Sequence, residues 1–180
     1  RIAREGFGIA RAALDDTDLV LRDWTLRRLA TATGPAYLAR VDATAQGFAF
    51  DLRLAATQPV LLQGDAGLSR KGPDPAQTSY YLSEPQLVVS GSLTLAGDAR
   101  NVTGRAWLDH EWSDALLDRQ AVGWDWIGMN LDDGGALTAF RIRRQDGTTL
   151  WSGGSLRDAN GSVRNFGPDE VAFTPGRLWT

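Results

Sequence analysis

Residues 48–55 alternate large apolar side chains with small or charged ones, and this pattern limits the fold more than any other feature of the chain. The large apolar positions are Phe48, Phe50, Leu52 and Leu54. Successive side chains of a strand point to opposite faces, so the run predicts an antiparallel strand with one buried and one solvated face. A helix would instead need an apolar period of 3.6 residues.

Similar β-rich runs recur along the chain, separated by turns rich in Gly, Pro, Asp and Asn. Expected strands lie at 19–26, 37–43, 48–55, 59–62, 87–95, 102–108, 123–131, 136–144, 148–151 and 155–157. Short turns at 96–98 and 132–135 predict two hairpins, and 64–78 reads as a long surface loop. Only 113–120 could hold one short helical turn. About ten strands predict an all-β antiparallel barrel or sandwich.

Length and composition predict one soluble globular domain. A net charge of −3 with dispersed arginines argues against a nucleic-acid partner. No apolar run approaches the roughly 20 residues of a membrane-spanning helix. The absence of cysteine excludes disulfides and thiol catalysis. The chain opens at Arg1 without a signal-peptide pattern, and we expect a processed or truncated piece.

The candidate site is the stretch 105–143, which contains the only histidine, His110. Four of the seven tryptophans lie within twenty residues of one another around it: Trp107, Trp112, Trp124 and Trp126. Strand alternation places His110 and Trp112 on one face and Asp109 and Glu111 on the other. We expect the first pair to face inward. The same rule groups Trp124 with Trp126 and Arg141 with Arg143, so neighbouring strands would bring the histidine, the tryptophans and the arginines together.

Such a group predicts an aromatic-lined pocket with a few fixed polar side chains, the usual composition of a small-molecule site. His110, Asp109 and Glu111 are the candidate catalytic residues, since a histidine titrates near neutral pH and neighbouring carboxylates tune or replace it. The candidate ligand-binding residues here are Trp112, Trp124, Trp126, Arg141 and Arg143. The alternative is a core filled by tryptophans, with His110 satisfying a buried carbonyl. In that case Arg141 and Arg143 form a solvated face or pair with Asp125.

Other chemistries find no support in the sequence. No Gly-x-Ser-x-Gly motif accompanies the histidine, as a serine hydrolase of that type would need. A zinc site would have only His110, Asp109 and Glu111 as ligands, and alternation splits them between two faces. The glycine-containing segments 64–67 and 151–154 do not precede a helix as phosphate loops do. We expect neither a metal nor a cofactor.

The segment 104–112, which reads Gly-Arg-Ala-Trp-Leu-Asp-His-Glu-Trp, resembles a known family together with Gly-Trp-Asp-Trp at 123–126 and the strand 137–143. These motifs, with Arg-Asp-Trp at 22–24 and Tyr-Tyr-Leu-Ser-Glu-Pro-Gln-Leu at 80–87, look like the AttH-like or "predicted secreted hydrolase" proteins. That family is related to the carotenoid 1,2-hydratases. The resemblance covers most of the chain, and Tyr81 within it joins the expected ligand-binding residues.

The resemblance implies two lipocalin-like β domains in a chain of about twice this length, in the periplasm or outside the cell. Residues 1–175 would be most of the first domain, and 176–180 would begin a linker or the second domain. For hydratases it implies acid-catalysed addition of water to a C=C bond. His110 and Trp112 match the family's His-x-Trp, whereas the hydratases' Tyr and Asp of the following strand are absent from 138–143.

Three functions follow as expectations. The first is an exported domain that binds an apolar, lipid-like or isoprenoid molecule in the aromatic pocket. The second is a hydratase or isomerase in which Asp109 or Glu111 acts as the acid beside His110. The third is a structural domain whose partner domain carries the function. A hydrolase activity has no motif to support it.

Overall fold

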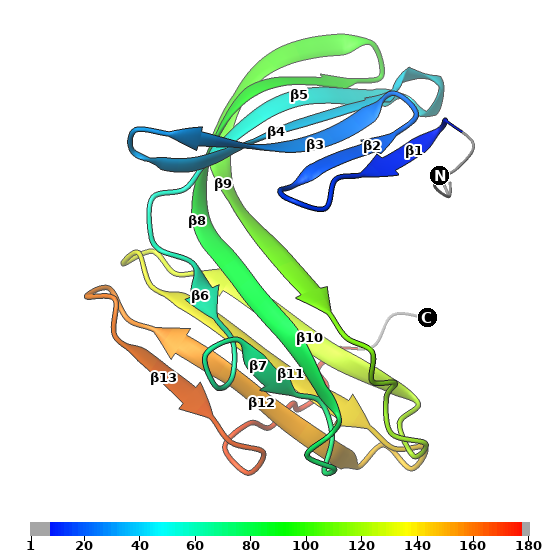
Figure 1. Cartoon of the computed structure of the whole chain (residues 1–180), viewed down its shortest axis with the longest axis vertical. Coiled ribbons are helices and arrows are strands. Elements are labelled where there is room, and N and C mark those ends of the chain that lie inside the picture. The colour runs from blue at the N-terminus through cyan, green and yellow to red at the C-terminus, as the bar shows by residue number, and fades with distance from the viewer. Residues whose placement is uncertain (1–7, 178–180) are drawn as a thin grey trace. The chain divides into compact units, whose positions relative to one another are not determined.

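The computed structural model describes residues 8–177, which form thirteen β-strands and one short 3₁₀ turn, η1. The strands are β1 Ala10–Ala12, β2 Asp18–Leu21, β3 Trp24–Thr31, β4 Gly34–Ala43, β5 Phe48–Ala55, β6 Leu61–Leu62, β7 Leu68–Arg70, β8 Thr78–Leu95, β9 Asp98–Trp112, β10 Gly123–Asn130, β11 Ala136–Arg143, β12 Thr149–Arg157 and β13 Val163–Phe166. η1 spans Thr44–Gln46. The described part of the chain divides into a first unit, residues 8–58 and 86–106, and a second unit, residues 59–85 and 107–177. The long strands β8 and β9 supply residues to both (Figure 1).

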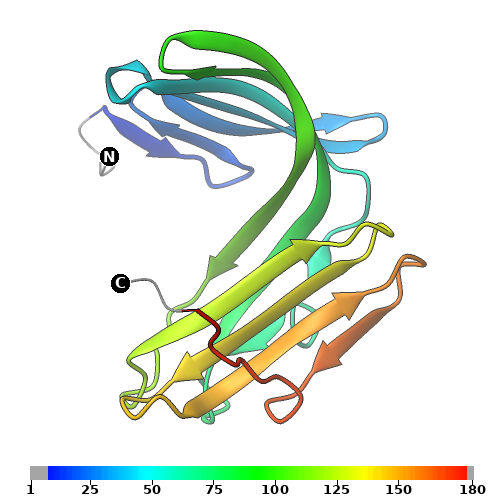
Figure 2. The same ribbon diagram turned by 180° about the vertical axis from the view of Figure 1, so that it is seen from behind.

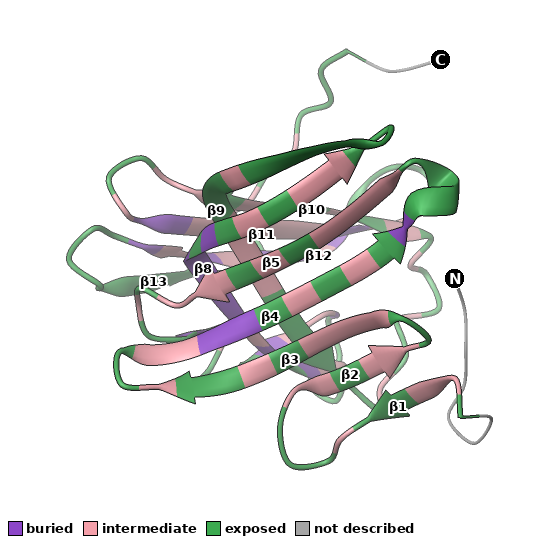
Figure 3. Ribbon diagram, turned by 90° about the horizontal axis from the view of Figure 1, so that it is seen from above, coloured by how far each residue is buried: buried purple, intermediate pink, exposed green. Residues whose placement is uncertain are grey.

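The first unit is an antiparallel sheet in which β1 to β5 pair in chain order and β5 then pairs with the second half of β8. The strand predicted at 48–55 is β5, with the predicted bounds. Figure 3 shows exposed and less exposed residues alternating along β4. The most buried apolar residues of the unit are Ala36, Tyr37, Ala43, Leu87 and Val89. Burying one leucine such as Leu87 contributes about 1.5–3 kcal/mol.

One expected strand of the first unit is two strands. The run at 19–26 contains the end of β2 and the start of β3, which are antiparallel neighbours with Leu21 opposite Trp24. Arg22 turns the chain between them with φ 61°, in the left-handed region that side-chain-bearing residues seldom adopt. The prediction was wrong because Arg and Asp do not mark a turn as strongly as Gly or Asn do.

The second unit has two facing layers. One contains β6, β7, the first half of β8 and the end of β9, and the other is the antiparallel sheet β10-β11-β12-β13, seen in Figure 2. Side chains join the layers: Trp151 Nε1 donates to the Arg70 carbonyl at 3.1 Å, and Asn165 Nδ2 donates to the Gly64 carbonyl at 2.7 Å. The predicted hairpin of 123–131 with 136–144 is β10–β11, with Asn130 opposite Ala136.

Some boundaries in the second unit differ from those predicted. The expected loop at 64–78 contains β7, which pairs with β8. The runs at 148–151 and 155–157 are one strand, β12, because Gly153 and Gly154 lie within the sheet instead of in a turn. Gly154 faces the β11 backbone so closely that a Cβ there would lie 2.1 Å from the Thr138 carbonyl oxygen. The helical turn expected at 113–120 does not form.

The prediction of an all-β antiparallel fold is confirmed, since hydrogen bonding joins the described strands into two antiparallel sheets. Within residues 8–177 no helix has the length and apolar character to cross a bilayer. The domain bounds 1–175 and 176–180 stay predictions, and 178–180 lie outside the described residues.

Candidate functional site

The candidate site is a cavity of about 260 Å³ in the second unit. It is lined by residues of both layers and by one residue of the 113–122 connection: Ser69, Lys71, Tyr81, Glu111, Leu117, Trp124, Trp126, Phe140 and Ile142. Four of these residues are aromatic, as the pocket prediction expected. Of the candidate residues named from the sequence, four line the cavity: Tyr81, Glu111, Trp124 and Trp126.

Tyr81 of β8 and Trp126 of β10 meet across the cavity. Trp126 Nε1 donates to Tyr81 Oη at 3.1 Å, and the Trp126 ring lies edge-on to Trp107 with 6.5 Å between ring centroids. Burial raises the pKa of the Tyr81 phenol well above its usual range, and the nearby negative charge of Asp109 raises it further. Tyr81 therefore stays protonated at neutral pH, beside the Asp109 carboxylate.

Asp109 is held beside this pair by two hydrogen bonds to the same oxygen. Ser83 Oγ donates to Asp109 Oδ1 at 2.6 Å, and Trp107 Nε1 donates to it at 2.7 Å. Trp107, Asp109 and Glu111 thus lie on one face of β9, the face that meets the cavity. A carboxylate fixed in this way is a positioned acceptor next to a protonated phenol.

A polar network in the core connects Asp109 to the opposite sheet. Gln63 Nε2 donates to Ser83 Oγ at 2.9 Å and to Thr138 Oγ1 at 3.1 Å, while Ser155 Oγ donates to Gln63 Oε1 at 2.7 Å. All four residues are at most 2% exposed. Sequence reasoning missed them because Ser, Thr and Gln in strands are ordinarily read as solvated positions.

His110 and Trp112 lie on the other face of β9. The Trp112 ring stacks on Tyr80 with centroids 5.4 Å apart, and the His110 ring lies 4.9 Å from Trp112. All three residues are exposed, and none lines the cavity. The grouping of His110 with Trp112 is as predicted, but the expectation that they face inward was wrong. Alternation states which side chains share a face, not which face meets the core. Their assigned roles stay predictions.

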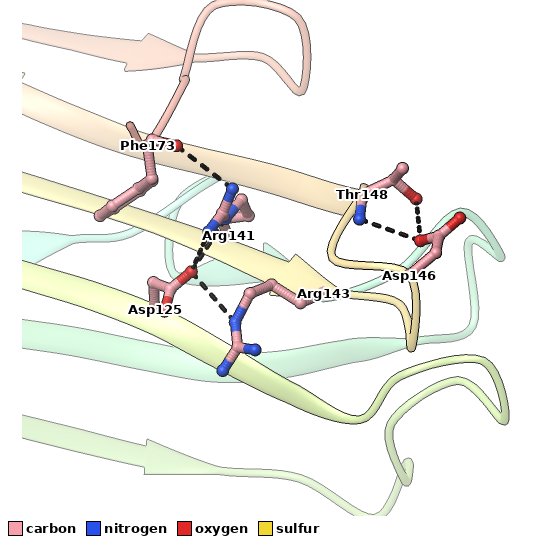
Figure 4. Close-up of polar contacts among 6 residues, drawn as sticks. All are labelled: Asp125, Arg141, Arg143, Asp146, Thr148 and Phe173. Atoms are coloured by element: carbon pink, nitrogen blue, oxygen red, sulfur yellow. Dashed lines mark hydrogen bonds and ion pairs between the residues drawn. The ribbon is translucent and has the colours of Figure 1, made fainter. Parts of the chain in front are cut away.

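Arg141 and Arg143 are not among the residues that line the cavity, and both lie against Asp125 (Figure 4). Arg141 donates to Asp125 Oδ2 through Nη2 at 2.6 Å and Nε at 2.8 Å, and Arg143 Nε lies 3.1 Å from that oxygen. Arg141 Nη1 also donates to the Phe173 carbonyl at 3.2 Å. The expected gathering of histidine, tryptophans and arginines was therefore wrong. Phe140 and Ile142, which alternate with the arginines, line the cavity instead.

The connection 113–122 brings Leu117 to the cavity and is tied to the β7–β8 connection. Ser113 Oγ donates to the Thr78 carbonyl at 2.6 Å, and Gln77 Nε2 donates to Asp118 Oδ2 at 3.1 Å. Ser69 lies within β7 and Lys71 directly follows that strand, and both line the cavity. These lining residues had no signal in the sequence, because the segment around them reads as a surface loop.

A second cavity, of about 370 Å³, shares Ser69, Tyr81 and Phe140 with the first. Its wall includes Arg70, whose guanidinium carbon lies 4.3 Å from the centroid of the Trp151 ring. Tyr81 thus stands between two spaces of the same unit. Among residues 8–177, no three His, Cys, Asp or Glu side chains converge as metal ligands would.

Comparisons with known proteins agree on the fold. The model of a family described as AttH-like matches residues 1–180. A crystal structure of a protein assigned to AttH, from Nitrosomonas europaea, superposes with a TM-score of 0.90 at 48% identity, over 98% of this chain and 54% of its own. Kievitone hydratase from Nectria haematococca superposes with a TM-score of 0.56 at 18% identity, over 72% of this chain and 39% of its own. The second likeness concerns the fold alone. Among curated proteins, none has a significant sequence match.

Proposed function

Because the chain belongs to the AttH-like family, we propose that its second unit binds an apolar small molecule, lipid-like or isoprenoid, in the cavity of about 260 Å³. The observation that carries the proposal is a lipocalin-like β unit whose cavity has an aromatic wall. Trp124 and Trp126 are 63% and 42% exposed although they line that cavity, so much of their surface is free for a ligand. Apolar contact with such rings is the main source of affinity in small-molecule sites.

The size of the cavity limits the ligand. Its volume of about 260 Å³ lies just below the roughly 300–1,000 Å³ of ordinary small-molecule pockets. This space suits a small ligand, with any longer chain extending out of the cavity. A ten-carbon isoprenoid such as geraniol is therefore the appropriate first probe.

The test is a titration with geraniol in which tryptophan fluorescence and calorimetry measure the binding. Trp126→Ala should weaken binding at least tenfold, about 1.4 kcal/mol or more. Trp112→Ala is the matched control, because Trp112 is 49% exposed and does not line the cavity. This substitution should leave the affinity for geraniol within twofold. Circular dichroism checks that both variants fold. Equal effects of the two substitutions, or saturable binding by neither variant nor parent, would contradict the proposal and favour a structural role.

A hydratase is the second candidate, favoured by Tyr81 and Asp109 beside the cavity. In such a reaction an acid adds a proton to one alkene carbon, and water adds to the resulting cation and then releases a proton to a base. The rings of Trp124 and Trp126 are placed to stabilise that cation. Geraniol that gains one water on incubation, with the gain abolished by Asp109→Asn in a folded protein, would support this activity. An unchanged rate in that variant would exclude Asp109 from it.

We also propose that the parent protein carries a second lipocalin-like domain, since the chain spans about half of the Nitrosomonas europaea protein that it resembles. An exported location is part of the same proposal and is supported by the family resemblance. Fractionation of cells that express the full-length parent gene tests it, and a protein found only in the cytoplasm would contradict it.

A further inference from the structure

The two layers of the second unit form cavity walls that differ in polarity. The β7–β8–β9 layer, with Lys71 just after β7, contributes the polar side chains Ser69, Lys71, Tyr81 and Glu111. The β10–β11 sheet contributes the apolar ones, Trp124, Trp126, Phe140 and Ile142. A ligand that satisfies both walls must itself have an apolar body and a polar group on one side.

Lys71 is the only lysine of the chain and the only cation that lines this cavity. It is half-buried, and its ammonium makes no hydrogen bond or ion pair with any residue of the described range 8–177. The arginines nearby are engaged elsewhere: Arg70 donates to the Gly72 carbonyl, and Arg141 pairs with Asp125. Lys71 therefore presents an uncompensated positive charge to an aromatic space.

Glu111 is the anion of the same lining, yet no ion pair joins it to Lys71. Glu111 is exposed, so water screens its charge, whereas Lys71 is partly withdrawn from water. An ammonium that has lost part of its hydration gains most from a charge-assisted hydrogen bond to an oxyanion. The residual charge of Glu111 disfavours a ligand with a second negative charge.

From these contacts we infer that the ligand of the cavity is a monoanionic carboxylic acid, with its carboxylate on Lys71 and its hydrocarbon body against Trp124 and Trp126. The inference rests on the proposed function and specifies the head group of its ligand. Ser69 lines the same wall, and its hydroxyl is a group that can donate to a carboxylate oxygen.

Geranic acid and geraniol test the head group, because they share one ten-carbon skeleton and differ in charge at pH 7. Calorimetry should show the acid binding at least tenfold more tightly than the alcohol. Lys71→Gln should weaken the binding of geranic acid at least tenfold and leave the affinity for geraniol within twofold. Unchanged geraniol binding also shows that the cavity is intact. Glu111→Gln should strengthen binding of the acid.

Arg100→Gln is the matched control, since it removes one positive charge from an exposed residue of the first unit. It should keep the preference for the acid. Equal affinities for acid and alcohol in the parent protein, or an acid affinity unchanged in Lys71→Gln, would overturn the inference while the proposed function stands. Binding of neither compound would overturn both.

Discussion

The Ser83 hydroxyl donates a 2.6 Å hydrogen bond to Oδ1 of Asp109, which joins the buried polar network of the second unit to a carboxylate beside Tyr81. Ser83 has no exposed surface and also accepts from Gln63. The Ser83 side chain therefore links the packing of the core to the position of the Asp109 carboxylate beside Tyr81. The site and the stability of the unit are consequently linked.

Replacing Ser83 by alanine should lower the free energy of unfolding by about 1–2 kcal/mol, because the buried Gln63 loses one acceptor and Asp109 loses one donor. Urea denaturation followed by circular dichroism measures the change. Ser90→Ala on the same strand is the control, since Ser90 is exposed, and it should change stability little. A loss no larger than that of the control would show that the network does not stabilise the fold.

The raised pKa of Tyr81 predicts that the stability of the protein depends on pH in the alkaline range. Its pKa is raised by burial and by Asp109, so above about pH 10 the unfolded phenol ionises while the folded one keeps its proton. The contribution of Tyr81 to stability is present below the unfolded pKa and is lost as pH rises above it. The parent protein should therefore lose stability relative to Tyr81→Phe between pH 9 and 11, by up to about 1.4 kcal/mol per pH unit. A difference that stays constant over this range would contradict the assignment.

Asp125→Asn should destabilise the second unit by about 1–2 kcal/mol, because Arg141, with only 13% of its side chain exposed, loses its carboxylate partner. Thermal unfolding at low and high salt gives the measurement, and high salt should reduce the difference. Asp98→Asn, which removes the exposed pair with Arg100, should have little effect. If geraniol affinity fell in Asp125→Asn without loss of folding, the arginine face would have to be part of the site.

His110→Ala separates the sequence-based expectation from the observed geometry. The ring contacts Trp112 on the face away from the cavity, so the substitution should leave geraniol affinity within twofold and stability nearly unchanged. The same titration that tests Trp126→Ala measures it. A loss of binding comparable to that of Trp126→Ala would show that His110 reaches the ligand after all.

The strands were predictable wherever the pattern was local. The alternation of 48–55 and the turns of the two hairpins identified β5, β8–β9 and β10–β11, and alternation also grouped Trp124 with Trp126. The predicted strand boundaries were wrong where a glycine lay inside a sheet, as at Gly154, or where Arg22 formed a turn without a glycine. Within the site, the aromatic wall was predictable, whereas Lys71 and Ser83 were not.

By itself the sequence determined the strand content, the hairpins and the sets of side chains that share a face, because these depend on backbone geometry and on neighbours a few residues away. Only the tertiary structure decided which face of β9 meets the cavity, so that Glu111 lines it and His110 does not. It also brought Gln63 to Ser155, 92 residues further along the chain. Such contacts depend on how the layers pack and on which polar groups must be paired when water is excluded, and no local pattern encodes that.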